Sequence, residues 1–342
     1  MIKTLLVGFG FAAKVFHLPH LVHSEKFEVA GVVSRSGASK EYGDVSSVPV
    51  YATLDEALTQ SDATLYIITT PSNMHVDMMK QCIRAGKDIL VEKPAFLTVE
   101  EGEELIQLAE KSESVVSVHQ NRRWDGDFLT LQKLLQEGTL GDWKVLESRF
   151  DRFRPHVRNR WREQAGPGSG ILYDLGSHLL DQALVLFGEP DAVYAEVMTQ
   201  RENGQTDDGF FIVLHYGEKR VYLRSNSFIN SNYPRFELHG TKGSFVKCGL
   251  DMQEPQLIDG TFYEERMREV GTLHIEDTQD FSIQLGGYDQ FFSLLAEGLS
   301  KREPVVSLGE ALKMTKIIEM ARLSSEEGRV IKQEEWKGES VL

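Results

Sequence analysis

The sequence predicts an α/β protein that begins with a doubly wound parallel sheet and continues into a second domain with a mostly antiparallel sheet. Short apolar runs alternate with helix-period segments over the first third of the chain, which is the pattern of βαβ units. After about residue 120 the runs become longer and alternate in polarity, as strands of an antiparallel sheet do. The length of 342 residues suits about two domains.

The expected strands of the parallel sheet are apolar or β-branched runs, short enough to be buried on both faces. They are residues 2–7, 27–33, 63–69, 88–91 and 115–119. Two helices are expected between these strands. One covers residues 73–85 and ends at Gly86, and the other covers residues 98–111 and begins with the capping sequence Thr98-Val99-Glu100-Glu101.

The second half of the chain predicts strands joined by hairpin turns, followed by two helices. The strands are residues 143–153, 192–200, 210–216, 220–225 and 235–240, and the helices are residues 288–299 and 308–324. Tyr216-Gly217-Glu218 and Gly240-Thr241-Lys242-Gly243 have turn composition. No element is predicted for residues 251–284. The boundary is placed near Asn121, which gives domains of residues 1–120 and 121–342.

Composition excludes several classes of partner. Lys and Arg total 37 against 52 Asp and Glu, a formal charge of −15, and this argues against nucleic acid or an anionic membrane surface as the main partner. The two cysteines, Cys82 and Cys248, exclude a disulfide framework. The amino-terminal apolar run is too short for a signal peptide, and no run is long enough to span a membrane. We therefore expect a cytoplasmic protein.

A glycine-rich turn follows the first expected strand and opens a helix. It consists of Gly8, Phe9, Gly10, Phe11, Ala12 and Ala13. This context is the one that a dinucleotide-binding G-x-G-x-x-G/A turn requires, because the glycines allow a tight turn and let backbone amides approach a pyrophosphate. The alternative is an ordinary strand-to-helix turn.

The end of the second strand indicates which dinucleotide binds. An NAD site usually places Asp or Glu there for the ribose hydroxyls, but this chain has Ser34, Arg35 and Ser36. An arginine can form bidentate hydrogen bonds to a 2′-phosphate, and serines can donate to it. NADP(H) is therefore favoured over NAD(H), the alternative being a surface arginine in a loop.

Polar residues also follow the next expected strand. Thr70, Pro71, Asn73 and His75 lie where ligands of open α/β sheets gather. Thr70 and Pro71 are placed to line the nicotinamide ribose. His75 is either a site residue or a packing residue at a helix N-terminus.

Glu92-Lys93-Pro94 ends the fourth expected strand. A lysine at this point faces the same ligand-binding edge of the sheet, and the proline excludes a simple helical continuation. A partly desolvated lysine beside a nicotinamide is suited to moving a hydroxyl proton. The alternative is a Lys-Pro turn at the surface.

A predicted helix carries three titratable side chains in the second half. Asp174, His178 and Asp181 are spaced i, i+4 and i+7, so a regular helix would place them on one face. They fit an imidazole that is oriented by a carboxylate and exchanges a proton with substrate. The same pattern fits a metal pair or a plain polar helix face, and metal is the weakest of the three because no cysteine or third histidine clusters there.

Taken together, these motifs resemble the Gfo/Idh/MocA oxidoreductases over nearly the whole chain. The matching segments are the Gly8–Ala13 turn, Glu92-Lys93-Pro94, Asn121-Arg122-Arg123-Trp124-Asp125 and Asp174-x-x-x-His178-x-x-Asp181. Within the family, the chain is most similar to the NADP-dependent scyllo-inositol dehydrogenase group, as shown by Ser34-Arg35, the run from Asn121 to Thr130, and Tyr173-Asp174-Leu175-Gly176-Ser177-His178.

The resemblance implies a Rossmann domain, then an α/β domain whose large open sheet mediates dimerisation or tetramerisation. It implies that Lys93 and His178 move the hydroxyl proton and that Asp174 acts with His178. It further implies that the peptide before Pro94 is cis. The resemblance also makes several residues contacts of the cofactor or of a polyol; they are Glu92, Asn121, Arg122, Tyr173 and Tyr288.

The sequence thus predicts an NADP(H)-dependent enzyme without a bound metal that interconverts a secondary alcohol and a ketone on a cyclic polyol or sugar. A scyllo-inositol-like substrate is favoured. The alternatives are a dehydrogenase or reductase of another sugar or diol, and a non-catalytic NADP-binding regulator on the same fold. The presence of Lys93, Asp174 and His178 argues against the regulator.

Overall fold

The computed structural model describes residues 1–35 and 45–336, and the contacts within it divide the chain into two compact units. The first unit comprises Met1–Asn121, Gln253–Glu265 and Gly287–Leu312, and the second comprises Arg122–Met252, Arg266–Gly286 and Lys313–Leu342. Asn121, where the sequence predicts the boundary, ends the first continuous segment. Two later segments also pack with the first unit.

The first unit is built on a parallel sheet. Among the described residues, six strands form it in the order β3-β2-β1-β4-β5-β6, and every pairing is parallel. The strands are β1 Ile2–Val7, β2 Phe27–Val33, β3 Val50–Tyr51, β4 Leu65–Ile68, β5 Asp88–Glu92 and β6 Val116–His119. The central strands are buried on both faces, as their apolar runs predict. The predicted doubly wound parallel sheet is confirmed.

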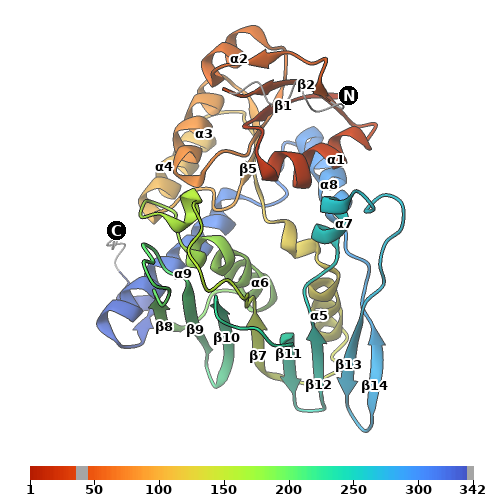
Figure 1. Ribbon diagram of the computed structural model, residues 1–342, viewed down its shortest axis with the longest axis vertical. Helices are drawn as coiled ribbons and strands as arrows, with labels where there is room; N and C mark the ends of the chain where they lie inside the picture. Colours follow the sequence, from red (N-terminus) through yellow and green to blue (C-terminus); the bar gives the residue numbers. More distant parts are fainter. Residues whose placement is uncertain (36–44, 337–342) are drawn as a thin grey trace. The chain divides into compact units, whose positions relative to one another are not determined.

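Helices cover both faces of this sheet. They are η1 Ala13–His17, α1 Leu18–Val22, α2 Leu54–Gln60, η4 Ser72–Met74, α3 His75–Arg84, α4 Val99–Glu110, α7 Gln253–Asp259 and α8 Tyr288–Lys301. In Figure 1, α3 and α4 lie side by side on one face, and α1 and α8 lie together on the other. Thr98 caps α4. Its hydroxyl oxygen accepts a hydrogen bond from the Glu101 N–H at 3.2 Å, and the Glu101 carboxylate accepts one from the Thr98 N–H at 3.3 Å.

The second unit is built on a larger sheet. Within the described part of the chain its nine strands follow the order β14-β13-β12-β11-β7-β10-β9-β8-β15. They are β7 Trp143–Arg149, β8 Ala192–Met198, β9 Gly209–Tyr216, β10 Lys219–Asn226, β11 Pro234–Gly240, β12 Ser244–Cys248, β13 Val270–His274, β14 Thr278–Ser282 and β15 Ile331–Lys332. The remaining helical elements are η5 Asn121–Trp124, α5 Gly126–Gln136, η6 Trp161–Glu163, η7 Leu172–Gly176, α6 Ser177–Phe187, α9 Leu308–Glu327 and η8 Gln333–Glu335.

The large sheet is mostly antiparallel, as predicted, with one exception. β7 and β10 are paired in parallel, Arg220 opposite Val145. Polarity alternation does not distinguish the two pairings, because side chains alternate between faces in both. The segment without a predicted element contains α7, β13 and β14. β14 was not predicted because its sequence has no apolar alternation, and its side chains are largely exposed.

Alternate side chains of the central strands form the core of the second unit. Phe210, Ile212 and Leu214 of β9 are buried, and so are Val221 and Leu223 of β10. The side chains between them are only half-buried. None of the helices in the described part of the chain combines the length and hydrophobicity that crossing a membrane requires.

Candidate active site

The glycine turn directly follows β1. Gly8 has φ +93°, in the left-handed region that favours glycine, and a Cβ there would lie 3.1 Å from Oγ1 of Thr69. The Thr69 hydroxyl donates to the carbonyl oxygen of Gly8 at 3.1 Å. A Cβ on Gly10 would instead meet open space. The turn therefore packs tightly against β4 at Gly8 and leaves the approach to Gly10 open.

The helix after this turn begins at Phe11 and contains a π turn. η1 covers Ala13–His17 and continues directly into α1, and the N–H of Lys14 donates to the carbonyl of Gly10 at 3.2 Å. Phe9 is buried and Phe11 is 59% exposed. The first amides of a helix have no partner within it, so this N-terminus is suited to a pyrophosphate.

Arg35 lies just beyond the end of β2 and is exposed. The preceding residue, Ser34, donates its N–H to the carbonyl of Tyr51 at 2.9 Å, which fixes the chain at the strand end. Ser36 lies outside the described residues. No carboxylate stands at Ser34 or Arg35 to accept ribose hydroxyls.

His75 joins two loops at the carboxyl edge of the parallel sheet. Its Nδ1 lies 2.8 Å from the carbonyl oxygen of Pro94, and its Nε2 lies 2.9 Å from that of Thr70. A carbonyl oxygen only accepts, so either contact is a hydrogen bond when the ring nitrogen concerned carries the proton. Two further predicted contacts lie between Thr70 and His75 in the sequence. Pro71 precedes η4, and Asn73 lies within it.

Lys93 follows the last residue of β5 and is 8% exposed. Its peptide to Pro94 is cis, as the resemblance implies. Because the sheet is parallel, the carboxyl ends of β1, β4 and β5 meet at one edge. Lys93 therefore lies on the same edge as the Gly8 turn.

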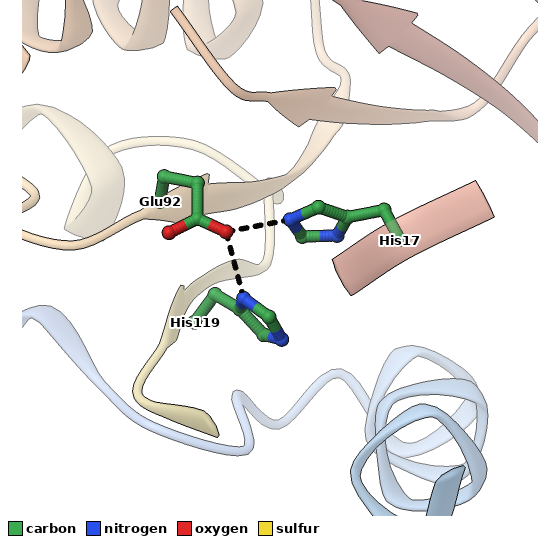
Figure 2. Close-up of side chains that lie close together, drawn as sticks. All are labelled: His17, Glu92 and His119. Atoms are coloured by element: carbon green, nitrogen blue, oxygen red, sulfur yellow. Dashed lines mark hydrogen bonds and ion pairs between the residues drawn. The ribbon is translucent and has the colours of Figure 1, made fainter. Parts of the chain in front are cut away.

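The Glu92 carboxylate contacts two histidines (Figure 2). Its Oε1 lies 2.7 Å from Nε2 of His17 and 2.9 Å from Nδ1 of His119. This cluster was not predicted from the sequence. A signal was available, since Glu92 and His119 end adjacent strands of one parallel sheet and are paired in register.

Asp174 and His178 belong to the second unit. Asp174 lies in the π turn η7 and forms an ion pair with Arg162 at 3.1 Å. His178 is buried near the start of α6. The helix expected through Asp174, His178 and Asp181 is not regular, because the π turn η7 precedes α6. That the three side chains share one face stays a prediction. Asp181 accepts hydrogen bonds of 2.8 and 2.7 Å from Arg123.

Tyr173 lines a pocket of the second unit. The pocket has a volume of about 680 Å³ and is bordered by residues 165–169, Asp207 and Arg322. The Arg322 guanidinium lies 5.0 Å from the Tyr173 ring centroid and 3.5 Å from Asp207. Burial raises the pKa of the Tyr173 hydroxyl, so this side chain is a neutral hydrogen-bonding group.

The other predicted contacts are also buried. Asn121 is 6% exposed, and Arg122 is 6% exposed with its guanidinium 3.2 Å from Asp125. Tyr288 is 2% exposed at the first position of α8, where its N–H donates to Gln253 Oε1 at 2.9 Å. Their roles as cofactor or polyol contacts stay predictions.

The parallel sheet and the turn after β1 define an NAD(P)-binding oxidoreductase, and comparison with known proteins agrees. Residues 2–120 match the model "Oxidoreductase family, NAD-binding Rossmann fold", and residues 132–332 match "Oxidoreductase family, C-terminal alpha/beta domain". The chain belongs to the Gfo/Idh/MocA family of oxidoreductases.

Individual relatives match over almost the full chain. The chain is 37% identical to the scyllo-inositol 2-dehydrogenase (NADP(+)) IolW of Bacillus subtilis, over 96% of this chain and 95% of that protein. It is also 37% identical to the Uncharacterized oxidoreductase YdgJ of Escherichia coli, over 93% and 95% of the two chains. The solved structure of an oxidoreductase from Bacillus cereus superposes with a TM-score of 0.85 at 31% identity, covering 98% and 100% of the two chains.

Proposed function

We propose that the protein is an NADP(H)-dependent oxidoreductase that interconverts a secondary alcohol and a ketone on a cyclic polyol or sugar. The observation that carries the proposal is the placement of Lys93. It is a buried lysine at the carboxyl end of β5, on the edge of the sheet where the glycine turn ends β1. An ammonium or amine at that edge is suited to exchange a proton with a substrate hydroxyl.

The described residues fit a dinucleotide. The conformation of Gly8 and the open space beside Gly10 leave room for phosphates at the N-terminus of η1. Arg35 stands at the end of β2, where a 2′-phosphate lies in this fold, and neither of the described residues there, Ser34 and Arg35, is acidic. Ser34, Thr70, Pro71, Asn73 and His75 complete the proposed contacts. A nicotinamide held there would supply or accept the hydride.

The chain's own residues move the proton. In oxidation, Nζ of Lys93 accepts the hydroxyl proton, and in reduction it returns the proton. His178 assists this transfer, and Asp174 orients its ring. Lys93 is only 8% exposed, which limits competition from bulk water for this proton.

The substrate proposal is a scyllo-inositol-like polyol. One relative at 37% identity over 96% of the chain bears the name of a scyllo-inositol dehydrogenase. Arg122, Tyr173 and Tyr288 offer a guanidinium and two phenols, which are groups that hydrogen-bond to polyol hydroxyls. We place these three side chains as the substrate contacts.

Initial rates test the proposal. Wild type and Lys93→Ala are assayed with NADP⁺ and NAD⁺ against a panel of inositols and aldoses. We expect NADP⁺-dependent oxidation of an inositol and its loss in Lys93→Ala. A preference for NAD⁺ would contradict the role proposed for Arg35. No measurable oxidation of any polyol by the wild type would contradict the substrate assignment.

We also propose that copies of the chain associate through the nine-stranded sheet. Phe211 and Tyr222 stack on it with ring centroids 6.2 Å apart and are only half-buried. Aromatic side chains of this kind are enriched at interfaces. Light scattering is expected to give a mass two or four times the 38.7 kDa of one chain, and a monomer would contradict the proposal. Nucleic acid and membranes are not proposed as partners.

A further inference from the structure

The Glu92 carboxylate lies between two buried imidazoles, an arrangement that the proposed reaction does not use. Oε1 is 2.7 Å from Nε2 of His17 and 2.9 Å from Nδ1 of His119. The exposed fractions of the His17, Glu92 and His119 side chains are 0%, 13% and 3%. We call these three residues the buried triad (Figure 2).

In the buried triad, the Glu92 carboxylate accepts a hydrogen bond from each histidine. Burial, and to a smaller extent the neighbouring His119, lower the pKa of His17 to about 4, while Glu92 acts in the opposite direction. Burial opposes ionisation of Glu92, but the two histidines outweigh it and hold its pKa well below the usual range. A carboxylate only accepts, so His17 donates through Nε2 and His119 through Nδ1.

The same three side chains are of the types that bind metals, and their ligand atoms lie within 4.8 Å of one another. Their spacing favours hydrogen bonds. Ligand atoms around a tetrahedral zinc stand roughly 3.3 Å apart, whereas both nitrogens here are closer than 3 Å to one oxygen. A zinc-bound histidine also normally donates its other ring nitrogen, and Nδ1 of His17 meets no partner among the described residues.

The triad joins three segments of the first unit. His17 ends η1, the helical turn that follows the glycine turn, while Glu92 ends β5 and His119 ends β6. Phe291 and Phe292 of α8 cover the histidines, with ring centroids 5.0 Å from His119 and 5.9 Å from His17. Glu92 thus ties the end of β5 to the helix that follows the glycine turn.

A second contact fixes the chain on the other side of Lys93. The carbonyl of Pro94 accepts from His75 at 2.8 Å. Lys93 therefore lies between two residues that are each held by buried histidines. Small displacements of a catalytic group cost large factors in rate, about 100-fold for an error near 1 Å.

We propose that Glu92 is a positioning residue, whose hydrogen bonds to His17 and His119 set the position of Lys93 relative to the glycine turn. This inference rests on the proposed function for the role of Lys93 in proton transfer. The hydrogen bonds themselves require only the geometry of the first unit.

Matched pairs of variants test the proposal in the full-length protein. His17→Leu removes a donor to Glu92, whereas His17→Gln keeps an amide N–H at a similar reach. Glu92→Ala removes the acceptor, whereas Glu92→Gln keeps one acceptor oxygen. Glu104→Gln is the control, because this exposed carboxylate pairs with Lys80 on the surface.

The readouts are kcat per cofactor-binding site and the deuterium isotope effect on kcat with substrate deuterated at the reacting carbon. We expect His17→Leu and Glu92→Ala to lower kcat about 10- to 100-fold and to raise the isotope effect. His17→Gln should stay within about 3-fold of wild type, and Glu92→Gln should recover most of the activity that Glu92→Ala loses. A merely structural role would reduce the number of sites and leave both readouts per site unchanged, which would overturn the proposal.

Two further measurements keep the outcome decisive. Stoichiometric zinc in the purified wild type that is lost in His17→Leu would also overturn the proposal, in favour of a metal site. If the wild type turns over no polyol, the proposed function fails, and the NMR signal of Lys93 labelled by ¹³C reductive methylation decides the positioning role alone. That signal should shift in His17→Leu but not in His17→Gln or Glu104→Gln. An unchanged signal in His17→Leu would overturn the proposal.

Discussion

Thr69 Oγ1 stands 3.1 Å from the position that a Cβ on Gly8 would occupy, and the Thr69 carbonyl carbon stands 3.3 Å from it. Part of this contact is backbone, which cannot rotate away as a long side chain could. The end of β1 and the end of β4 are therefore close enough that only glycine fits between them. This is the physical reason for glycine at the first position of the turn.

Substitution of the two glycines should separate folding from binding. Gly8→Ala is expected to lower the free energy of unfolding by at least about 1–2 kcal/mol, the cost of a side chain at positive φ, and to weaken cofactor binding. Gly10→Ala should leave the stability of the free protein nearly unchanged, because its Cβ meets open space, and weaken binding alone. Urea denaturation measures the free energy of unfolding, and cofactor fluorescence measures binding. Equal stability losses in the two variants would contradict this account.

Arg35 should determine the choice of cofactor. Loss of hydrogen bonds between a guanidinium and a 2′-phosphate is expected to weaken NADP⁺ binding about 10- to 100-fold and to leave NAD⁺ binding unchanged. Titration of Arg35→Ala with both cofactors measures the effect. Arg84→Ala is the control, since Arg84 is an exposed residue at the end of α3. A parallel loss of both cofactors in Arg35→Ala would argue against recognition of a 2′-phosphate.

The stability of the protein should depend on pH through His17. Burial lowers its pKa from 6.5 to about 4, so the unfolded chain binds a proton at a higher pH than the folded protein does. This contribution is complete above pH 6.5 and is lost as the pH falls toward 4, a total of about 3 kcal/mol. His17→Gln cannot titrate and should lose less stability between pH 7 and pH 4.5 in urea denaturation. Identical pH slopes for the two proteins would refute the prediction.

Arg123 and Asp181 form an ion pair whose side chains are 13% and 3% exposed. Arg123→Ala should therefore remove a buried charge partner of Asp181 and cost about 3–5 kcal/mol of stability. Lys133→Ala removes a surface pair of about 50% exposure and should cost less than about 1 kcal/mol. Thermal denaturation compares the two variants. A similar, small loss of stability in both variants would contradict the prediction and would show that Asp181 is stabilised by another partner or becomes protonated.

The parallel sheet could be predicted closely because its signals are local. β1 and β2 begin and end where the apolar runs at residues 2–7 and 27–33 do. The cap of α4 was recognisable from Thr98 and Glu101, since the spacing itself specifies the reciprocal hydrogen bonds.

The remaining features depend on contacts between distant segments. The π turns at η1 and η7 have no signal in the helical period of the sequence, so the irregular helix between Asp174 and His178 was not predictable. The triad depends on where His17 meets the ends of two strands. That meeting follows from packing under α8, which short-range patterns do not encode.

The proposed reaction requires Lys93 to exchange a proton with a secondary alcohol beside the nicotinamide. A crystal structure with NADP⁺ and an inositol bound tests it most directly. We expect one substrate hydroxyl within about 3 Å of Nζ of Lys93, with the carbon that bears it facing the nicotinamide ring. A polyol whose hydroxyl next to the nicotinamide is held by other side chains, with Lys93 out of hydrogen-bond reach, would contradict the claim.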